Sequence, residues 1–269
     1  MDKYQIFATQ IRTEALKMVC RAKASHIGGA LSMADILSVL YSDILQIDPQ
    51  NPDACDRDRF ILSKGHACTA LYATLALKGF FPMEELSTYG QDNSRLMSHT
   101  NHKVPGVELS TGSLGHAFPV SCGLAYAARI KQETWKTYCL LSDGELDEGS
   151  NWEAFMFAAH HHLHNLTAII DYNKIQAMGN TNEVICLEPL EDKLNAFGWN
   201  VISIDGHNYE IIEAALLQPT TKPKAVIAHT IKGKGVDFME NSLLWHYRNP
   251  TEEQLAEALA QLQIQNPKS

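Results

Sequence analysis

Asp143 and Asn173 are the two residues whose types and surroundings best suit the chemistry of a bound cation. Each follows a short apolar run and stands in a polar turn, at positions 142–145 and 171–174. A carboxylate, a side-chain amide and a free backbone carbonyl at one place form an oxygen set that suits Mg²⁺ or Ca²⁺. Gly144 would let the backbone come close to a bulky group such as a phosphate. From these residues alone, an ordinary Asp-Gly turn and an Asn turn explain the pattern equally well.

The elements around Asp143 and Asn173 are expected to bring them to one edge of a sheet. The apolar runs 138–141 and 166–170 are typical of buried parallel strands, and residues 150–162 between them have helical spacing. A strand–helix–strand unit forms a right-handed crossover, so both strands end at the same edge. Open parallel sheets bind their ligands at that edge.

Three further glycine-flanked loops are expected at the same place. They contain His26, His66 and the run Gly112–Gly115. Histidines on loops indicate function more strongly than histidines on helix faces, because loops carry sites on a rigid scaffold. For each histidine taken alone, a surface or locally hydrogen-bonded role is the commoner explanation. The long segment 90–111, which contains His99 and His102, has little periodicity, as functional or mobile loops do.

Strands and helices alternate along the whole chain. Helical spacing predicts a first helix over residues 2–24. The paired glycines Gly28 and Gly29 should stop this helix. Ser32 is expected to cap a second helix that runs to Leu45. Further strands are predicted at 59–62, 199–204 and 225–229, and further helices at 67–78, 83–89, 209–217 and 251–264. This alternation predicts an α/β fold, with one parallel sheet flanked by helices on both faces. Without a linker or repeat, residues 1–269 are expected to form a single domain.

The composition argues against several classes of protein. A net charge of −9 without a basic stripe disfavours nucleic acid or an anionic membrane as a partner. No apolar run approaches the roughly 18 residues of a membrane span, and the polar start carries no signal-peptide segment. The six cysteines form no CxxC pair, and several lie in apolar runs, as reduced core thiols do. We therefore expect a soluble, cytoplasmic protein.

Three other features have ordinary interpretations that we favour. His160 and His164 lie one helical turn apart, but no cysteine or carboxylate pair follows at zinc-site spacing, so this run should end the crossover helix. The stretch Lys232–Gly235 lacks the spacing and the Ser/Thr of a phosphate loop, and a flexible basic loop is slightly favoured. Glu148 and Glu153 flank the start of the crossover helix, where the helix dipole favours solvated acids.

Taken together, five ordered blocks resemble the amino-terminal part of transketolases. Two of them, around Asp143 and Asn173, form a thiamine diphosphate motif, in which Asn follows Gly-Asp-Gly after about 30 residues. The other three are residues 25–32, 62–67 and 110–116. The resemblance spans nearly the whole chain, from about residue 14 to the region of His246. Five blocks in the same order are much more specific than the diphosphate motif alone.

The resemblance implies a role for each matching residue. Mg²⁺ or Ca²⁺ would be held by Asp143, by the side chain of Asn173 and by the backbone carbonyl of Ile175, together with two diphosphate oxygens and a water. Further cofactor contacts would come from residues of the same loops: His66, Gly112, Ser113, Leu114, Gly144 and Glu145. The catalytic residues that line the channel, bind sugar hydroxyls and shuttle protons would be His26, His66, His99 and His246. His102 is the alternative to His99, whose spacing from Leu96 matches the family.

The resemblance also implies that this chain alone lacks a complete active site. Full transketolases continue with a pyrimidine-binding domain and a carboxy-terminal domain, and the glutamate that activates the cofactor lies in the first of these. We therefore expect the alpha subunit of a split transketolase. It would be active only with a separate beta subunit, in an α₂β₂ heterotetramer. Glu148 and Glu153 match acids that meet across the family's dimer interface, where close carboxylates must share protons.

The implied reaction transfers a two-carbon ketol unit from a ketose, or a ketose phosphate, to an aldose. The cofactor supplies the electron sink, and the protein supplies orientation and proton transfer. Two sequence departures stand near the cofactor: Ser142 replaces the first glycine of the motif, and His116 stands where Gln is common.

Three alternatives explain the sequence less well. An alpha subunit of a 2-ketoacid dehydrogenase would share the diphosphate motif but would not explain residues 25–26 and 63–66, which suit polyhydroxylated sugars. A decarboxylating synthase of the deoxyxylulose type is normally one long chain, and a ketol-transferring branch-sugar synthase is a further alternative. A non-catalytic, partner-binding remnant would not be expected to keep its metal ligands at the right spacing.

Overall fold

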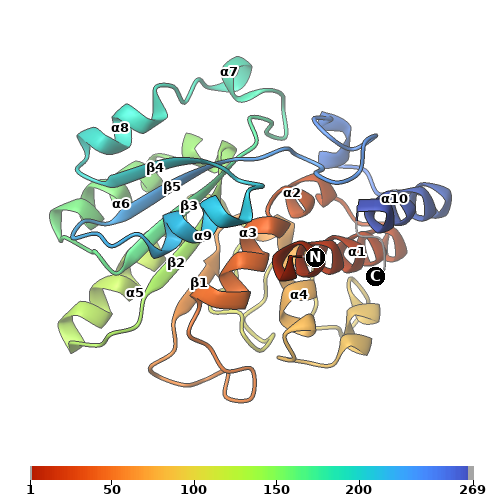
Figure 1. Cartoon of the computed structure of the whole chain (residues 1–269), viewed down its shortest axis with the longest axis horizontal. Coiled ribbons are helices and arrows are strands. Elements are labelled where there is room, and N and C mark those ends of the chain that lie inside the picture. The colour runs from red at the N-terminus through yellow and green to blue at the C-terminus, as the bar shows by residue number, and fades with distance from the viewer. Residues whose placement is uncertain (1, 266–269) are drawn as a thin grey trace.

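The structure, a computed structural model, describes residues 2–265 and is built on one sheet of five parallel strands (Figure 1). The strands lie in the order β1-β2-β3-β5-β4. Their bounds are β1 (Arg59–Leu62), β2 (Thr137–Ser142), β3 (Leu166–Tyr172), β4 (Asn200–Asp205) and β5 (Lys224–His229). Strands β2 and β3 are buried along their whole length. A sheet centre of this kind needs cover on both faces.

Helices supply that cover, and they confirm the predicted α/β class. The α-helices are α1 (Lys3–Ala22), α2 (Ile27–Ser32), α3 (Ala34–Val39), α4 (Cys68–Leu77), α5 (Ala117–Lys131), α6 (Gly149–His160), α7 (Thr181–Val184), α8 (Leu190–Ala196), α9 (Tyr209–Leu217) and α10 (Glu252–Gln265). Shorter helical turns are η1 (Leu40–Ile44), η2 (Gly65–Ala67), η3 (Met83–Thr88), η4 (Gly144–Asp147) and η5 (Leu243–His246). Helices α1 and α10 lie side by side at one end of the molecule (Figure 1).

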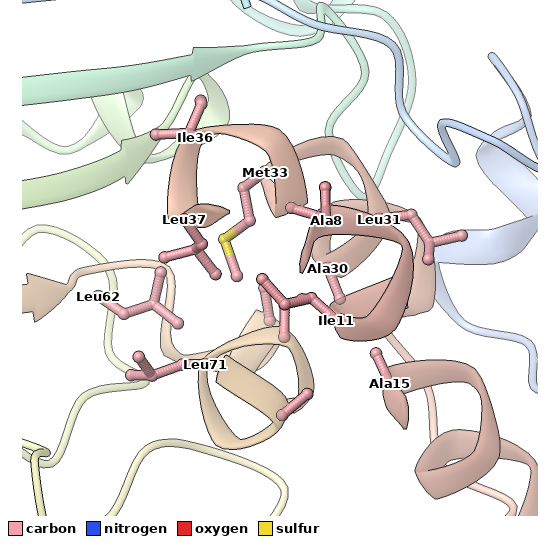
Figure 2. Packing of buried hydrophobic residues seen from close by; sticks show 14 of the residues in the cluster. Ala8, Ile11, Ala15, Ala30, Leu31, Met33, Ile36, Leu37, Leu62 and Leu71 are labelled. Atoms are coloured by element: carbon pink, nitrogen blue, oxygen red, sulfur yellow. The ribbon is translucent and has the colours of Figure 1, made fainter. Parts of the chain in front are cut away.

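Successive side chains of each strand belong to two separate cores, because alternate residues of a strand lie on opposite faces of the sheet. Leu140 of β2 packs with α1, α3, α4 and α9, whereas Leu141 packs with α5, α6 and α8. Figure 2 shows part of the first of these cores, to which Met33, Leu37 and Leu71 belong. Burying one such side chain stabilises the fold by about 1.5–3 kcal/mol. The two cores therefore fix the sheet whose edge carries the site.

The predicted crossover unit is confirmed. Ser142 pairs in register with Asp171, so β2 and β3 end together, and α6 connects them. His160 is the last residue of α6, as expected. Asp143 and Asn173 consequently follow two neighbouring strand ends.

The prediction for residues 25–45 is wrong in its details. Gly28 and Gly29 lie inside α2, and Ser32 ends that helix instead of capping the next one. The reason is tertiary: a Cβ on Gly28 would lie 3.1 Å from Cγ of Lys232, so close packing favours glycine inside the helix. Ser32 is fully buried, and its hydroxyl donates to the carboxylate of Asp171 at 2.5 Å.

Two general predictions can be compared with the described part of the chain. No helix among these residues is both long enough and apolar enough to cross a membrane. All six cysteines are free; Cys55 and Cys186 are exposed, and the other four are buried. The expectation of core thiols therefore holds for four of the six.

Candidate active site

A cavity of about 260 Å³ lies beyond the carboxyl ends of β1, β2, β3 and β5. Each of the five loops expected at this edge contributes to it, through His26, His66, Gly112 with Leu114, Asp143 with Gly144, and Asn173 with Ile175. The cavity thus brings together residues that are far apart in the sequence, as the crossover topology predicts.

Asp143 is almost fully buried at 1% exposure and is held by two backbone groups. Its Oδ1 accepts from the amide of Gly144 at 2.7 Å, and its Oδ2 accepts from the amide of Lys174 at 2.5 Å. Burial, with the charge of Asp171 second, raises the pKa of Asp143 to about 6. Asp143 therefore links the loop after β2 to the loop after β3. The two amides offset only part of the negative charge of its carboxylate.

Asn173 and Ile175 complete the predicted oxygen set on the wall of the same cavity. Asn173 Oδ1 accepts from the amide of Ile175 at 3.1 Å, and the carbonyl of Ile175 accepts from Lys232 Nζ at 2.7 Å. Among the described residues, no group of three or more His, Cys, Asp or Glu could hold a metal ion. A cation at this place would therefore use amide and backbone oxygens beside one carboxylate, a donor set that fits Mg²⁺ or Ca²⁺.

A buried ion pair that the sequence analysis did not find lies beneath this oxygen set. Lys64 and Asp171, at 1% and 0% side-chain exposure, form the pair, and Ser32 and Thr230 donate to the same carboxylate. Burial alone would raise the pKa of Asp171, but Lys64 and these hydrogen bonds outweigh it and hold the pKa below its usual value. In the sequence, only the positions of these two residues pointed to the pair: Lys64 lies in the block 62–67, and Asp171 lies two residues before Asn173.

The four histidines predicted to line the channel all border the cavity. The ring of His26 lies 5.1 Å from that of His66, 6.1 Å from His99 and 5.2 Å from His246, measured between centroids. Of the two candidates in the long loop, His99 lies at the cavity, whereas His102 is exposed with its Nδ1 2.8 Å from Ser110 Oγ.

Three of these rings are held uncharged at neutral pH. Burial, followed by neighbouring histidine and lysine charges, lowers the pKa of His26 to about 4 and that of His246 to about 3. The pKa of His66 is also well below its usual value, chiefly through burial and then through Lys64. Neutral imidazoles can both donate and accept hydrogen bonds, which suits a channel for hydroxylated ligands.

His26 is placed by a left-handed backbone conformation that residues other than glycine rarely adopt. Its φ is 71°, and its amide donates to the carbonyl of His246 at 2.9 Å. Such a conformation costs roughly 1–3 kcal/mol and persists only where the surroundings enforce it. Ser25 Oγ lies 2.9 Å from His26 Nδ1 and fixes the ring.

The prediction of a flexible basic loop at 232–235 is wrong for Lys232. This side chain is 3% exposed, lines the cavity, and places its Nζ 2.7 Å from the Ile175 carbonyl and 2.9 Å from His246 Nδ1. Burial lowers the pKa of Lys232 to about 8. Local sequence could not reveal this burial, since it depends on packing against Gly28 of a distant helix.

Several predicted residues lie around the cavity without lining it. Glu145 is fully buried, and its carboxylate accepts from Ser63 Oγ and, at 3.0 Å, from the amide of Gly115. Glu145 therefore links the loop after β1 to the loop before α5 by hydrogen bonds. Ser113 and the acids Glu148 and Glu153 are exposed.

Gly144 borders the cavity and also makes a close approach to a neighbouring loop. A Cβ on Gly144 would lie 2.9 Å from Cβ of Gln176. The glycine therefore lets the loop after β2 pack against the loop after β3. His116, one of the two departures, is exposed at the start of α5, while Ser142 borders the cavity.

An open parallel sheet with a cavity, an oxygen set and buried lysines at its carboxyl edge is the arrangement in which α/β domains of this class bind their ligands. A family model described as "Transketolase, thiamine diphosphate binding domain" matches residues 3–268. The chain belongs to the transketolase family of transferases and carries its thiamine diphosphate-binding domain. The resemblance drawn from the five sequence blocks is thereby confirmed.

Individual relatives agree with this assignment. One of the subunits of the apulose-4-phosphate transketolase of Phocaeicola vulgatus is 44% identical over 97% of this chain and 94% of its own length. A 6-deoxy-6-sulfo-D-fructose transketolase subunit of a Clostridium species is 44% identical over 95% of this chain and 94% of its own length. The crystal structure of Campylobacter jejuni transketolase matches with a TM-score of 0.94 at 36% identity, over 97% of this chain. This chain spans only 43% of that transketolase. These matches do not favour the 2-ketoacid dehydrogenase or synthase alternatives.

Proposed function

We propose that this chain is the alpha subunit of a thiamine diphosphate-dependent transketolase, which moves a two-carbon ketol unit from a ketose or ketose phosphate to an aldose. The observation that carries the proposal is the convergence of four histidines, three of them held neutral, over the Asp143–Asn173–Ile175 oxygen set in one cavity. The two relatives at 44% identity are named for different sugars, so they support the reaction type more strongly than any one substrate.

The donor set supports a specific placement of the cofactor. Asp143, the Asn173 side chain and the Ile175 carbonyl would hold Mg²⁺, or Ca²⁺, at the diphosphate. Other contacts would come from cavity residues and one neighbour: His66, Lys232 and the Gly144 backbone at the diphosphate, with Gly112, Ser113 and Leu114 along the rings. Bound thiamine diphosphate would supply the electron sink for cleaving the ketose carbon–carbon bond.

The histidines would bind the sugar and move protons. An ammonium group can only donate, so the contact with Lys232 Nζ makes His246 Nδ1 an acceptor and leaves the ring proton on Nε2. His26 has its Nδ1 engaged by Ser25, which leaves Nε2 for the ligand. Together with His66 and His99, these rings would orient hydroxyl groups and exchange protons with them.

We further propose a separate beta subunit that carries the pyrimidine-binding and carboxy-terminal domains, in an α₂β₂ heterotetramer. This fits a chain that spans 94% of a relative named as one subunit of a transketolase but 43% of a full transketolase. Val120 on α5 and Met156 and Phe157 on α6 are 42%, 50% and 39% exposed, and these two helices pack against each other. Together with the exposed Glu148 and Glu153 at the start of α6 and within it, they support a second copy on these helices. The net charge of −9 fits a cytoplasmic enzyme of small sugars better than one that binds nucleic acid or membranes.

The test combines the purified chain with a purified candidate beta subunit, Mg²⁺ and thiamine diphosphate. We expect ketol transfer from ketose phosphates with both chains present and none with either chain alone. Robust turnover by the isolated chain would contradict the two-subunit proposal. Consumption of 2-ketoacids instead of ketoses would contradict the reaction type.

A further inference from the structure

We infer that His207 is a positioning residue for Lys232: it holds the backbone at Ile231 so that the ammonium group of Lys232 stays in the cavity. This inference rests on the proposed function, because it concerns the lysine that would face the cofactor. His207 follows β4, whereas Ile231 and Lys232 follow β5. The contact therefore ties the edge strand of the sheet to the loop that carries the lysine.

The ring of His207 bridges two groups. Its Nε2 accepts from the amide of Ile231 at 2.8 Å, and its Nδ1 lies 2.7 Å from Oδ2 of Asp35. An amide can only donate, so Nε2 carries no proton and the ring donates to Asp35 through Nδ1. Both ring nitrogens are hydrogen-bonded, and these two bonds fix the tautomer and the orientation of the ring.

Asp35 is a rigid anchor for this ring. Arg12 of α1 donates to both of its oxygens, at 2.9 and 2.6 Å, and Tyr209 donates to Oδ1 at 2.9 Å. Burial opposes the charge, but Arg12 and His207 hold the pKa of Asp35 well below its usual range. The carboxylate therefore stays ionised, on a helix packed in the core, and gives the imidazole a fixed point of attachment.

The loop beyond β5 is attached at four successive residues. Thr230 donates to Asp171, Ile231 donates to His207, and Lys232 reaches the Ile175 carbonyl. The amide of Gly233 donates to the carbonyl of Gly28 at 3.0 Å. The turn before His207 lies directly against this loop: the amide of Gly206 donates to the carbonyl of His229 at 2.8 Å. A Cβ on Gly206 would lie 2.5 Å from Cγ2 of Thr230, so the contact needs glycine. Of these four attachments, only the one at Ile231 leads to the Arg12–Asp35 pair.

Three variants separate positioning from general support of the fold. His207→Leu removes both hydrogen bonds. His207→Gln can keep both, because its amide oxygen can accept from Ile231 while its NH₂ group donates to Asp35. Tyr209→Phe is the matched control, since it removes a different hydrogen bond to the same carboxylate and leaves Ile231 untouched.

The experiment measures two quantities in the complex with the beta subunit: amide hydrogen exchange of the peptide containing Ile231, and thiamine diphosphate affinity with Mg²⁺ by calorimetry. For His207→Leu we expect about tenfold faster exchange at Ile231 and about tenfold weaker affinity. His207→Gln and Tyr209→Phe should stay within about threefold of wild type in both.

Unchanged exchange in His207→Leu would overturn the inference, and so would faster exchange with wild-type affinity. Equal losses of affinity and of Tm in all three variants would assign His207 a purely structural role and also overturn it. Absence of thiamine diphosphate binding by the wild-type complex would overturn the proposed function itself, which distinguishes that failure from the others.

Discussion

Asp143 and Asp171 are two buried carboxylates at the ends of neighbouring strands, yet they have different partners. Asp171 is paired with Lys64 inside the protein, and its pKa is lowered. Asp143 accepts only two backbone amides, and its pKa is raised to about 6. The comparison teaches that a buried carboxylate with its own cation holds the fold, whereas one without it is available to an external cation.

The largest expected effect comes from breaking the internal pair. Lys64→Met should destabilise the chain by about 3–5 kcal/mol, because Asp171 would be left buried without its cation. Urea unfolding at pH 7 measures this loss. The double variant Lys64→Met with Asp171→Asn is the control and should recover part of the stability. A loss below about 1 kcal/mol in the single variant would contradict the assigned role of the pair.

The second prediction concerns the other carboxylate. Asp143→Ala should weaken Mg²⁺-dependent thiamine diphosphate binding by roughly 100-fold or more, since a metal ligand is lost. Its free energy of unfolding without ligands should change far less than that of Lys64→Met. Calorimetry measures the binding, with Asp147→Ala as a control four residues along the chain. Wild-type affinity in Asp143→Ala would rule out the proposed metal site.

The third prediction concerns the histidine above the oxygen set. His26→Ala should lower turnover of the two-subunit enzyme by about 100-fold, as expected for loss of a proton-transferring group. Cofactor affinity should fall much less, because His26 is expected to contact the sugar. Steady-state kinetics with calorimetry separate the two quantities. A variant with wild-type turnover would contradict this role.

The smallest effect is a pH dependence that follows from the raised pKa of Asp143. A carboxyl group whose pKa is raised from 3.8 to about 6 on folding lowers stability as pH rises through that interval. At pH 7.5 the group is ionised and ready for a cation, whereas at pH 5 it is mostly protonated. Adding Mg²⁺ and thiamine diphosphate should therefore raise Tm by roughly 2–4 °C more at pH 7.5 than at pH 5.

Thiamine diphosphate without metal provides the baseline at each pH for this measurement. Asp143→Ala should show no such difference between the two pH values. An equal shift of the wild-type protein at both pH values would mean that Asp143 does not titrate against the cation.

The strands, the crossover and the gathering of five loops could be predicted because each depends on local pattern and on general rules of sheet topology. Asp143, Asn173 and His66 could be predicted because their loops follow strand ends, whereas His26, His99 and His246 could be predicted through the resemblance to transketolases. The Lys64–Asp171 pair and the burial of Lys232 could not, since a lysine in a glycine-containing loop has the same local pattern whether it is buried or solvated. Gly28 and Gly29 were misplaced for the same reason: helix propensity disfavours glycine, and tertiary packing, above all that of Gly28 against Lys232, overrides it.

The backbone hydrogen bond between His26 and His246 has a consequence for how the protein folds. It joins a residue near the start of the chain to one near its end, and contacts of such long sequence separation form slowly, because a large loop must close first. The left-handed conformation of His26 gains its support only when that contact is made. The part of the cavity wall formed by His26 and His246 should consequently order later than the strand pairs of the sheet, whose partners are closer together in the sequence.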